Sequence, residues 1–163
     1  MNEIEWIVEL VDFPDYFISN YGRIFSEYKK EKRIELKPFY DKDGYLLIGI
    51  YKEGKKYTKK IHRLVCETFL ERVEGKNQVD HINRIKTDNK LENLRWCNRR
   101  ENNINKGMNI NNTSGVKGVS FNKRDNRWIG SIYIEKYKDK HKTFKTKEEA
   151  ITWRLEMEKK YYN

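Results

Sequence analysis

Residues 78–105 read QVDHINRIKTDNKLENLRWCNRRENNIN, and this stretch decides the central part of the fold. Residues 78–82 and 94–97 are predicted to form short strands on either side of a polar loop. Asn98 can cap a helix, and Glu101 three positions later completes a capping-box-like pair, so a helix is predicted over residues 99–105. The stretch therefore predicts two strands, a connecting loop and a helix.

Asp80 and His81 are the residues in this stretch that point to chemistry. Hydrolysis of a phosphodiester needs a deprotonated water, and the imidazole of His81 titrates near neutrality, which suits that task. A metal bound to Asp80 would neutralise charge on the phosphoryl and leaving oxygens. Adjacent side chains on a strand point to opposite faces, so both reach one site only if the strand ends or bends there. Taken alone, an Asp-His pair in a lysine-rich protein is more often an exposed turn.

Two asparagines complete the candidate site. A buried Asn93 would fasten the loop and hold the orientation of His81. Asn102, four residues into the predicted helix, could bring an amide oxygen to a metal. A carboxylate, an amide oxygen, waters and a substrate phosphate form a hard-oxygen shell that suits magnesium or manganese rather than zinc. Each asparagine alone is more often an ordinary turn or surface residue, and it is their joint order that favours a site.

The remainder of the chain divides into small segments at turn signals. Residues 6–61 alternate apolar and polar residues between turns, which predicts a small antiparallel meander. Residues 62–70 change to a helical period. Residues 107–114 are rich in asparagine and poor in apolar groups, which is typical of a linker. Beyond them, strands are predicted over residues 116–122, 128–134 and 141–144, followed by a helix that begins at a capping box of Thr146 and Glu149.

These patterns predict an α+β protein built of modules. The predicted divisions are an N-terminal β module (residues 1–61), a central strand-loop-strand-helix core (62–106), a linker (107–114) and a C-terminal three-stranded sheet with a helix (115–163). His62 heads the helix of the core, where a packing role or a phosphate contact is expected.

The charge distribution favours a polyanionic partner. The net charge is +10, and residues 113–163 contribute +6 of it. A basic surface attracts nucleic acid by counterion release, although a solvated lysine-rich face is the plain alternative. The two cysteines, Cys66 and Cys97, form no CxxC, which argues against a disulfide framework or a four-ligand zinc site. The N-terminus shows no signal-peptide pattern and no stretch has membrane-spanning length, so an intracellular, soluble protein is expected.

The segment HRLVCETFL at residues 62–70, together with residues 78–106, resembles the HNH nucleases of phage-intron homing endonucleases. The shared pattern is H-R-L-V, an apolar helix, V-D-H, an asparagine-rich loop, N-L-x-W and finally E-N. The resemblance implies a ββα-metal fold and a metal-dependent DNA endonuclease. It implies Asp80 and Asn102 as metal ligands, His81 as general base and Asn93 as the asparagine that constrains the loop. Mg²⁺ is the expected ion, with Mn²⁺ as the alternative and no zinc.

In the implied reaction a water attacks the phosphorus, His81 takes its proton and the 3′ oxygen leaves, giving a 5′-phosphate. One site per chain implies one nick per monomer, whereas a double-strand break would need a dimer or two visits. The expected partner is double-stranded DNA, bound by a monomer, with a dimer as the alternative and no membrane. The family's setting also points to a gene of a phage, a virus or another mobile element.

The flanking segments carry resemblances of their own. Residues 6–24 resemble the small module often found ahead of these nucleases, most clearly at Trp6, Ser19, Asn20, Gly22 and Arg23, and a core cluster of Trp6, Tyr16 and Phe17 is expected there. Residues 114–160 resemble the ethylene-response-factor type of DNA-binding domain, whose sheet lies in the major groove, although Thr143 stands where that family usually has glycine.

The candidate DNA contacts are basic side chains from all three modules: Arg23, Arg84, Lys86, Arg95, Arg99, Lys117, Lys123, Arg124, Arg127 and Lys142. The last five belong to the C-terminal module and are expected on the face of its sheet. Two other functions stay open. One is a non-catalytic DNA-binding protein on an HNH scaffold, against which the intact Asp80, His81, Asn93 and Asn102 argue. The other is a structural RNA-binding factor, for which the sequence shows no base-stacking signature.

Overall fold

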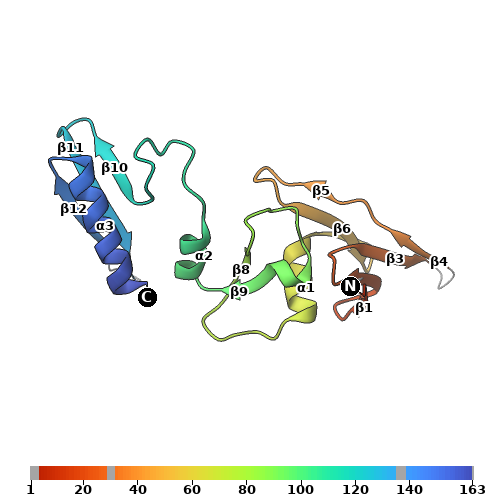
Figure 1. The fold of residues 1–163 in the computed structure, drawn as a ribbon. Helices are drawn as coiled ribbons and strands as arrows, with labels where there is room; N and C mark the ends of the chain where they lie inside the picture. The colour runs from red at the N-terminus through yellow and green to blue at the C-terminus, as the bar shows by residue number, and fades with distance from the viewer. Residues whose placement is uncertain (1–3, 29–31, 135–138, 163) are drawn as a thin grey trace. The chain divides into compact units, whose positions relative to one another are not determined.

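The computed structural model describes residues 4–28, 32–134 and 139–162. The chain divides into two compact units, Met1–Asn105 and Lys106–Asn163, and each is described by itself. Small antiparallel sheets combine with helices in both units, which confirms the predicted α+β class (Figure 1). None of the described helices has the length and apolar character needed to span a bilayer.

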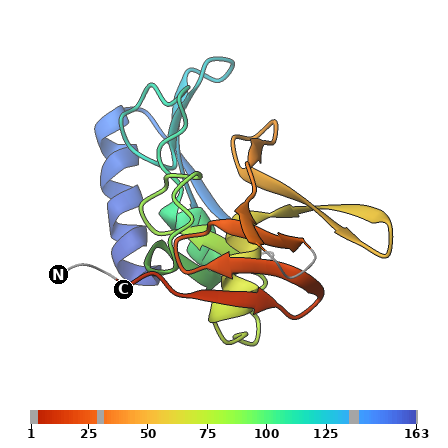
Figure 2. The same cartoon turned by 90° about the vertical axis from the view of Figure 1, so that its right-hand side faces the viewer.

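The first unit begins with two antiparallel sheets in place of the single meander predicted. The first sheet has the order β1 (Ile7–Leu10), β2 (Phe13–Ser19), β3 (Ile24–Tyr28) and β4 (Lys32–Glu35). The second has the order β5 (Phe39–Tyr40), β6 (Leu46–Lys52) and β7 (Lys55–Lys60). Figure 2 shows the β6–β7 hairpin projecting from the first unit.

A helix and a strand-loop-strand-helix segment follow. They comprise α1 (Ile61–Phe69), β8 (Gln78–His81), the short 3₁₀ helix η1 (Leu91–Asn93), β9 (Leu94–Cys97) and α2 (Arg99–Asn105). Strands β8 and β9 pair antiparallel. The cap predicted for α2 is present, because Asn98 Oδ1 accepts a hydrogen bond from Glu101 N and the Glu101 carboxylate accepts one from Asn98 N, both at 2.9 Å.

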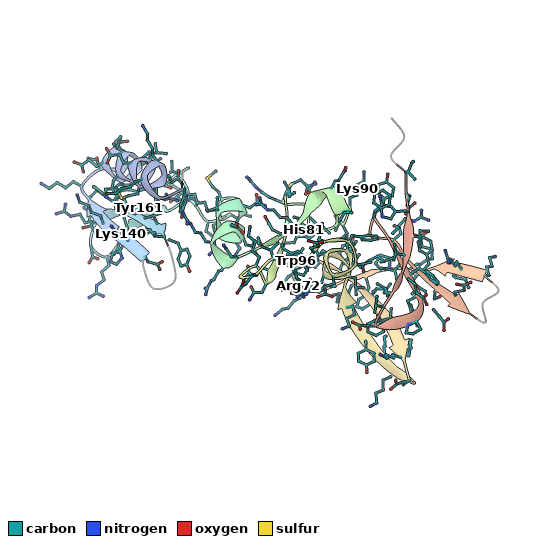
Figure 3. The ribbon with its side chains drawn as sticks, turned by 90° about the horizontal axis from the view of Figure 1, so that it is seen from below. Arg72, His81, Lys90, Trp96, Lys140 and Tyr161 are labelled. Atoms are coloured by element: carbon teal, nitrogen blue, oxygen red, sulfur yellow. The ribbon has the colours of Figure 1, made fainter. Side chains whose placement is uncertain are left out.

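One hydrophobic core joins these elements. Ile18 of the first sheet, Ile50 of the second, Val65 of α1 and Trp96 of β9 are all buried in it. The division predicted after residue 61 therefore does not separate two cores, because β7 continues into α1 and the apolar face of α1 packs on the N-terminal strands. Figure 3 labels His81 and Trp96 beside α1, with Arg72 lying 4.0 Å from the centre of the Trp96 ring.

The aromatic cluster predicted in the N-terminal segment forms only in part. Phe17 is buried and Tyr16 packs against the core, but Trp6 is 50% exposed. Trp6 directly precedes β1, which lies at the edge of its sheet, where a side chain has fewer neighbours. The alternation of apolar and polar residues does not reveal which strand lies at an edge.

The second unit is a three-stranded antiparallel sheet with a helix across one face (Figure 1). Its elements are β10 (Val119–Asn122), β11 (Arg127–Tyr133), β12 (Asp139–Phe144) and α3 (Lys147–Tyr161). The predicted capping box of Thr146 and Glu149 begins α3. A Cβ at Gly130 would lie 2.6 Å from the Trp153 ring, so the glycine lets the helix approach the sheet closely. Near the end of α3, Tyr161 accepts a hydrogen bond from Lys140 of β12 at 2.8 Å (Figure 3).

The segment predicted as a linker is partly folded onto the second unit. Residues 107–114 contain neither helix nor strand. However, Ser114 is only 3% exposed and donates a hydrogen bond to the carbonyl of Val119 at 2.7 Å. Asn112 Oδ1 accepts hydrogen bonds from the backbone N–H groups of Ser114 and Gly115. The free connection therefore ends before Asn112. The linker was predicted to extend further because side-chain capping of this turn cannot be recognised from composition alone.

Candidate active site

Asp80 and His81 lie at the end of β8 and are both buried, with 6% and 5% of their surface exposed. The strand ends at His81 because the chain turns at once. Ile82 N donates to the carbonyl of Asn93 at 2.8 Å, and Arg84, in the left-handed region at φ +66°, donates its N–H to the carbonyl of His81. Asp80 and His81 are consecutive strand residues, paired with Arg95 and Leu94 of β9. Their side chains contact different groups, Arg95 and Asn105 for Asp80 and Asn89 for His81.

The His81 ring is held by one side-chain partner. Its Nε2 lies 3.1 Å from Asn89 Oδ1, and Asn89 is itself buried. Because an amide oxygen can only accept, the neutral ring carries its proton on Nε2 and leaves Nδ1 with a free lone pair. Burial lowers the pKa of His81, while the hydrogen bond to Asn89 and the nearby Asp80 act in the opposite direction. His81 is thus neutral at neutral pH and able to accept a proton.

Two further rings surround His81. His62 stands edge-on to it with 5.1 Å between ring centres, and Tyr45 lies 5.0 Å from His62 and 6.0 Å from His81. His62 is 6% exposed, and its Nδ1 has no hydrogen-bond partner among the residues that the structure describes. Burial, reinforced by the charges of nearby basic groups, lowers the pKa of His62 to about 3. A neutral, packed His62 therefore supports one side of the His81 ring, in keeping with the packing role expected for it.

The Asp80 carboxylate is fully engaged. Arg95, directly opposite on β9, donates from Nε and Nη2 to Oδ2 at 3.0 and 2.8 Å. Asn105 of α2 donates its Nδ2 to both carboxylate oxygens, at 2.9 and 3.0 Å, and to the carbonyl of His81 at 2.8 Å. Asp80 is buried, whereas the Arg95 side chain is 46% exposed, so the carboxylate is fixed and the guanidinium is at the surface.

The structure does not direct the Asn102 amide to Asp80. Asn102 Nδ2 donates to Gln78 Oε1 at 2.8 Å, and the α2 amide that reaches Asp80 belongs to Asn105. Asn105 was not among the site residues predicted from the sequence. The available signal was its spacing of three residues from Asn102, which places both on one face of α2.

The donor chemistry fits a hard divalent cation. Asp80 offers a carboxylate, and α2 brings the Asn105 amide to Asp80 and the Asn102 amide to Gln78 at the start of β8. Such oxygen donors suit Mg²⁺ or Mn²⁺. Within the described part of the chain, no group of three or more His, Cys, Asp or Glu side chains is arranged to hold a metal ion.

Asn93 ties the two ends of the loop together. Its Oδ1 accepts from Asn83 N at 2.9 Å and its Nδ2 donates to the carbonyl of Asp88 at 2.8 Å. The backbone carbonyl of Asn93 accepts from Ile82 N. Asn93 therefore joins the two ends of the loop, whereas the direct side-chain partner of His81 is Asn89, which was not among the site residues predicted from the sequence.

The basic residues of the first unit differ in their exposure and in whether their charge is already paired within the fold. Arg23 bridges Glu5 and Glu35 at 2.8 and 2.6 Å, so its charge is compensated within the fold. Lys86 is exposed and donates to the carbonyl of Asp43 at 2.6 Å. Arg84 and Arg99 are also exposed. Arg95 is the basic residue that contacts Asp80 directly.

The sheet of the second unit presents fewer basic side chains than expected. Lys142 pairs with Gly130, so it belongs to the face that α3 covers and not to the open face. Arg127 pairs with Asn122 and lies on the open face. Lys123 and Arg124 are exposed in the β10–β11 turn, and Lys117 donates to the carbonyl of Lys106 at 2.8 Å. The period of two in a strand could have separated Arg127 from Lys142 only with the register known.

Two segments of the chain match known protein families. Residues 59–104 match the HNH endonuclease family, and residues 7–51 match the NUMOD4 motif. The chain therefore carries an HNH endonuclease domain preceded by a NUMOD4 motif, and these matches support a nuclease. Both matched regions end before residue 105, so the likeness of residues 114–160 to the ethylene-response-factor type stays a prediction.

Particular relatives are viral. HNH endonuclease L245 of Acanthamoeba polyphaga mimivirus is 39% identical over 90 residues, covering 55% of this chain and 26% of that protein. DNA endonuclease I-HmuI of Bacillus phage SP01 is 36% identical over 112 residues, covering 66% of this chain and 63% of that protein. The chain thus spans less than two thirds of the length of these relatives. A solved structure of the HNH homing endonuclease I-HmuI, described as showing DNA binding and cleavage, has a TM-score of 0.57 and 27% identity over 91% of this chain and 82% of that one.

Proposed function

We propose that this chain is a metal-dependent HNH DNA endonuclease of the homing type, which nicks one strand of double-stranded DNA per monomer. The observation that carries the proposal is the pair of buried residues at the end of β8. There His81 is neutral with a free Nδ1, and the neighbouring residue Asp80 offers a buried carboxylate held by Arg95 and Asn105, within a domain that matches the HNH family.

His81 acts as the general base in this proposal. Nδ1 takes a proton from a water, whose oxygen forms a bond to phosphorus while the bond from phosphorus to the 3′ oxygen breaks. The products are a 5′-phosphate and a 3′-hydroxyl, which takes its proton from solvent. Asp80 and an amide of α2, from Asn102 or Asn105, would hold the divalent cation, Mg²⁺ or Mn²⁺. When bound, the cation supplies neutralisation of the charge on the phosphoryl and leaving oxygens.

Double-stranded DNA is the substrate that the charge favours. The net charge is +10, and exposed basic side chains lie both beside the site and on the second unit. Such side chains would position the protein on phosphates, while an arginine on an open sheet face can contact base edges. We assign these contacts to the following exposed residues: Arg84, Lys86, Arg99, Lys123, Arg124 and Arg127.

A nicking assay on supercoiled plasmid tests the proposal. The protein is incubated with a pool of plasmids that carry random inserts, with Mg²⁺ or with excess chelator, beside Asp80→Ala as the inactive control. We expect open circles in Mg²⁺ only, and none with Asp80→Ala. Equal nicking in chelator would overturn the metal-dependent mechanism. DNA binding without any cleavage in Mg²⁺ or Mn²⁺ would favour the non-catalytic alternative.

A further inference from the structure

The turn at residues 19–23 of the N-terminal motif is held together by its own hydrogen bonds. Ser19 is fully buried, and its Oγ accepts hydrogen bonds from the backbone N–H groups of Tyr21 and Arg23, at 3.3 and 3.2 Å. Gly22 N donates to the carbonyl of Ser19 at 2.8 Å. These bonds satisfy the backbone of the turn locally and hold it in one conformation.

This turn abuts the loop that carries Asn89. Gly22 has a φ of +76°, and a Cβ on it would lie 2.7 Å from the Cβ of Asn89 and 2.9 Å from its carbonyl oxygen. Two residues further along the same loop, Leu91 N donates to the carbonyl of Asn20 at 2.7 Å. Glycine is therefore required at residue 22 both by the backbone conformation and by the close approach.

Asn89 packs against this turn on one side and contacts His81 on the other. It is 4% exposed, and its Oδ1 accepts from His81 Nε2 at 3.1 Å. Its Nδ2 lies 3.5 Å from the carbonyl of Thr87, which orients the amide with its oxygen toward the imidazole. Because Asn89 is buried and Gly22 packs closely against it, its Oδ1 is held in a fixed place.

We propose that Asn89 is a positioning residue, which holds the proton of His81 on Nε2 and leaves Nδ1 free, and that residues 19–23 of the NUMOD4 motif brace Asn89 from behind. This assigns the motif a part in assembling the nuclease site. A phosphate contact is the other use of such a motif, but the guanidinium of Arg23 is already held by Glu5 and Glu35. The inference rests on the proposed role of His81 as general base.

Loss of the acceptor has a defined consequence. A neutral imidazole without a partner distributes its proton between both ring nitrogens and is free to rotate. The fraction of molecules with a lone pair on Nδ1, aimed at the substrate, then falls. Loss of an outer partner of this kind commonly lowers activity by about 10- to 100-fold.

Nuclear magnetic resonance on the full chain tests the Asn89 step without any cleavage. Long-range ¹H–¹⁵N spectra of the His81 ring, assigned with His62→Phe and His141→Gln variants, report which nitrogen carries the proton. We expect the proton on Nε2 in the original chain and in Asn89→Asp, which keeps an acceptor, and a mixture of both tautomers in Asn89→Leu. The same tautomer in Asn89→Leu, in a sample shown by thermal unfolding to be folded, would overturn the assignment.

A matched pair of glycine variants tests the brace. Gly22→Ala adds a methyl group against Asn89, whereas Gly54→Ala adds one at a similar φ of +74° with no atom of the described residues within 4 Å. We expect Gly22→Ala to cut DNA at least about tenfold more slowly in single turnover, with a DNA Kd within about twofold of the original chain. Gly54→Ala controls for backbone strain and should cut at nearly the original rate.

The outcomes separate the two proposals. Equal cleavage by Gly22→Ala and Gly54→Ala would overturn the brace while leaving the nuclease assignment intact. If the original chain fails to cut any DNA, the nuclease assignment fails instead. In that case the His81 spectra of Gly22→Ala and Gly54→Ala still decide whether the turn controls the imidazole: a mixed tautomer in Gly22→Ala alone supports the brace, and identical spectra contradict it.

Discussion

At the scale of single residues, the site is a set of buried polar side chains that satisfy one another. Asp80, His81, Asn89 and Asn93 are each less than 10% exposed, and each forms at least one hydrogen bond to a neighbouring side chain or backbone group. Burying a polar group without a partner is costly, so such a network keeps its members in one arrangement. His62 differs, because its buried Nδ1 has no hydrogen-bond partner within the described part of the chain.

The contact of Arg95 with Asp80 predicts competition with a metal ion. Two unit positive charges about 4 Å apart repel by roughly 4 kcal/mol at an effective dielectric constant of 20, and a divalent ion doubles this repulsion, which the exposure of Arg95 then reduces. We therefore expect Arg95→Gln to bind Mn²⁺ about tenfold more tightly in the absence of DNA, as measured by electron paramagnetic resonance. Arg99→Gln removes the charge of an exposed residue of α2 and serves as the control. Equal Mn²⁺ affinities of Arg95→Gln and the original chain would contradict competition at Asp80.

His62 predicts a dependence of stability on pH. Its pKa is about 3 in the fold against an ordinary 6.5, so the unfolded chain binds a proton that the folded chain refuses between these values. The free energy of unfolding should fall as the pH drops from about 6.5 toward 3, by up to about 1.4 kcal/mol per pH unit for this group. Urea unfolding at several pH values between 7 and 4.5 measures it. His62→Phe should show a shallower slope, and an unchanged slope would refute the assignment.

At the scale of elements, local signals were sufficient for β8, β9 and α2. Alternating apolar residues, the Asn98–Glu101 cap and the Thr146–Glu149 box depend on residues close in sequence, and the structure confirms these elements within a residue or two. The contacts of Asn89 and Asn105 depend on how distant elements pack. Sequence periodicity could not distinguish Asn105 from Asn102, because both lie on the same face of α2.

The two asparagines of α2 can be separated by experiment. The family pattern makes Asn102 the metal ligand, whereas the structure brings Asn105 to Asp80. We expect Asn102→Ala to weaken cleavage in Mg²⁺ and to recover partly in Mn²⁺, which accepts a looser oxygen shell. Titration of both metals against the cleavage rate of Asn102→Ala and Asn105→Ala gives the comparison. If only Asn105→Ala alters the metal dependence, Asn105 supplies the amide ligand.

At the scale of the whole molecule, the N-terminal strands and the HNH segment share one core, and residues 106–163 form a second unit. The modular boundaries predicted from composition missed the shared core, because a change of pattern between strand and helix marks an element and not a domain. The compact first unit explains why the turn at residues 19–23 can contact the loop beside His81.

The charge of the second unit predicts where DNA affinity resides. Residues 113–163 contribute +6 of the +10 net charge, while Asp80 and His81 belong to the first unit. A chain ending at Lys106 should remain folded, bind DNA much more weakly and cut less selectively. Each lost phosphate contact should flatten the plot of log affinity against log salt concentration by about 0.9. DNA binding over a salt series measures this, and identical affinities and slopes for both chains would show that the second unit does not anchor DNA.

The role of His81 is the central claim, and His81→Ala tests it most directly. The measurement is single-turnover cleavage of a labelled DNA duplex at saturating protein, with DNA affinity determined on the same samples. We predict a cleavage rate at least about a hundredfold lower than that of the original chain, since a general base contributes on this scale, and a nearly unchanged affinity for DNA. Cleavage by a folded His81→Ala variant at the original rate would contradict the assignment of His81 as the base.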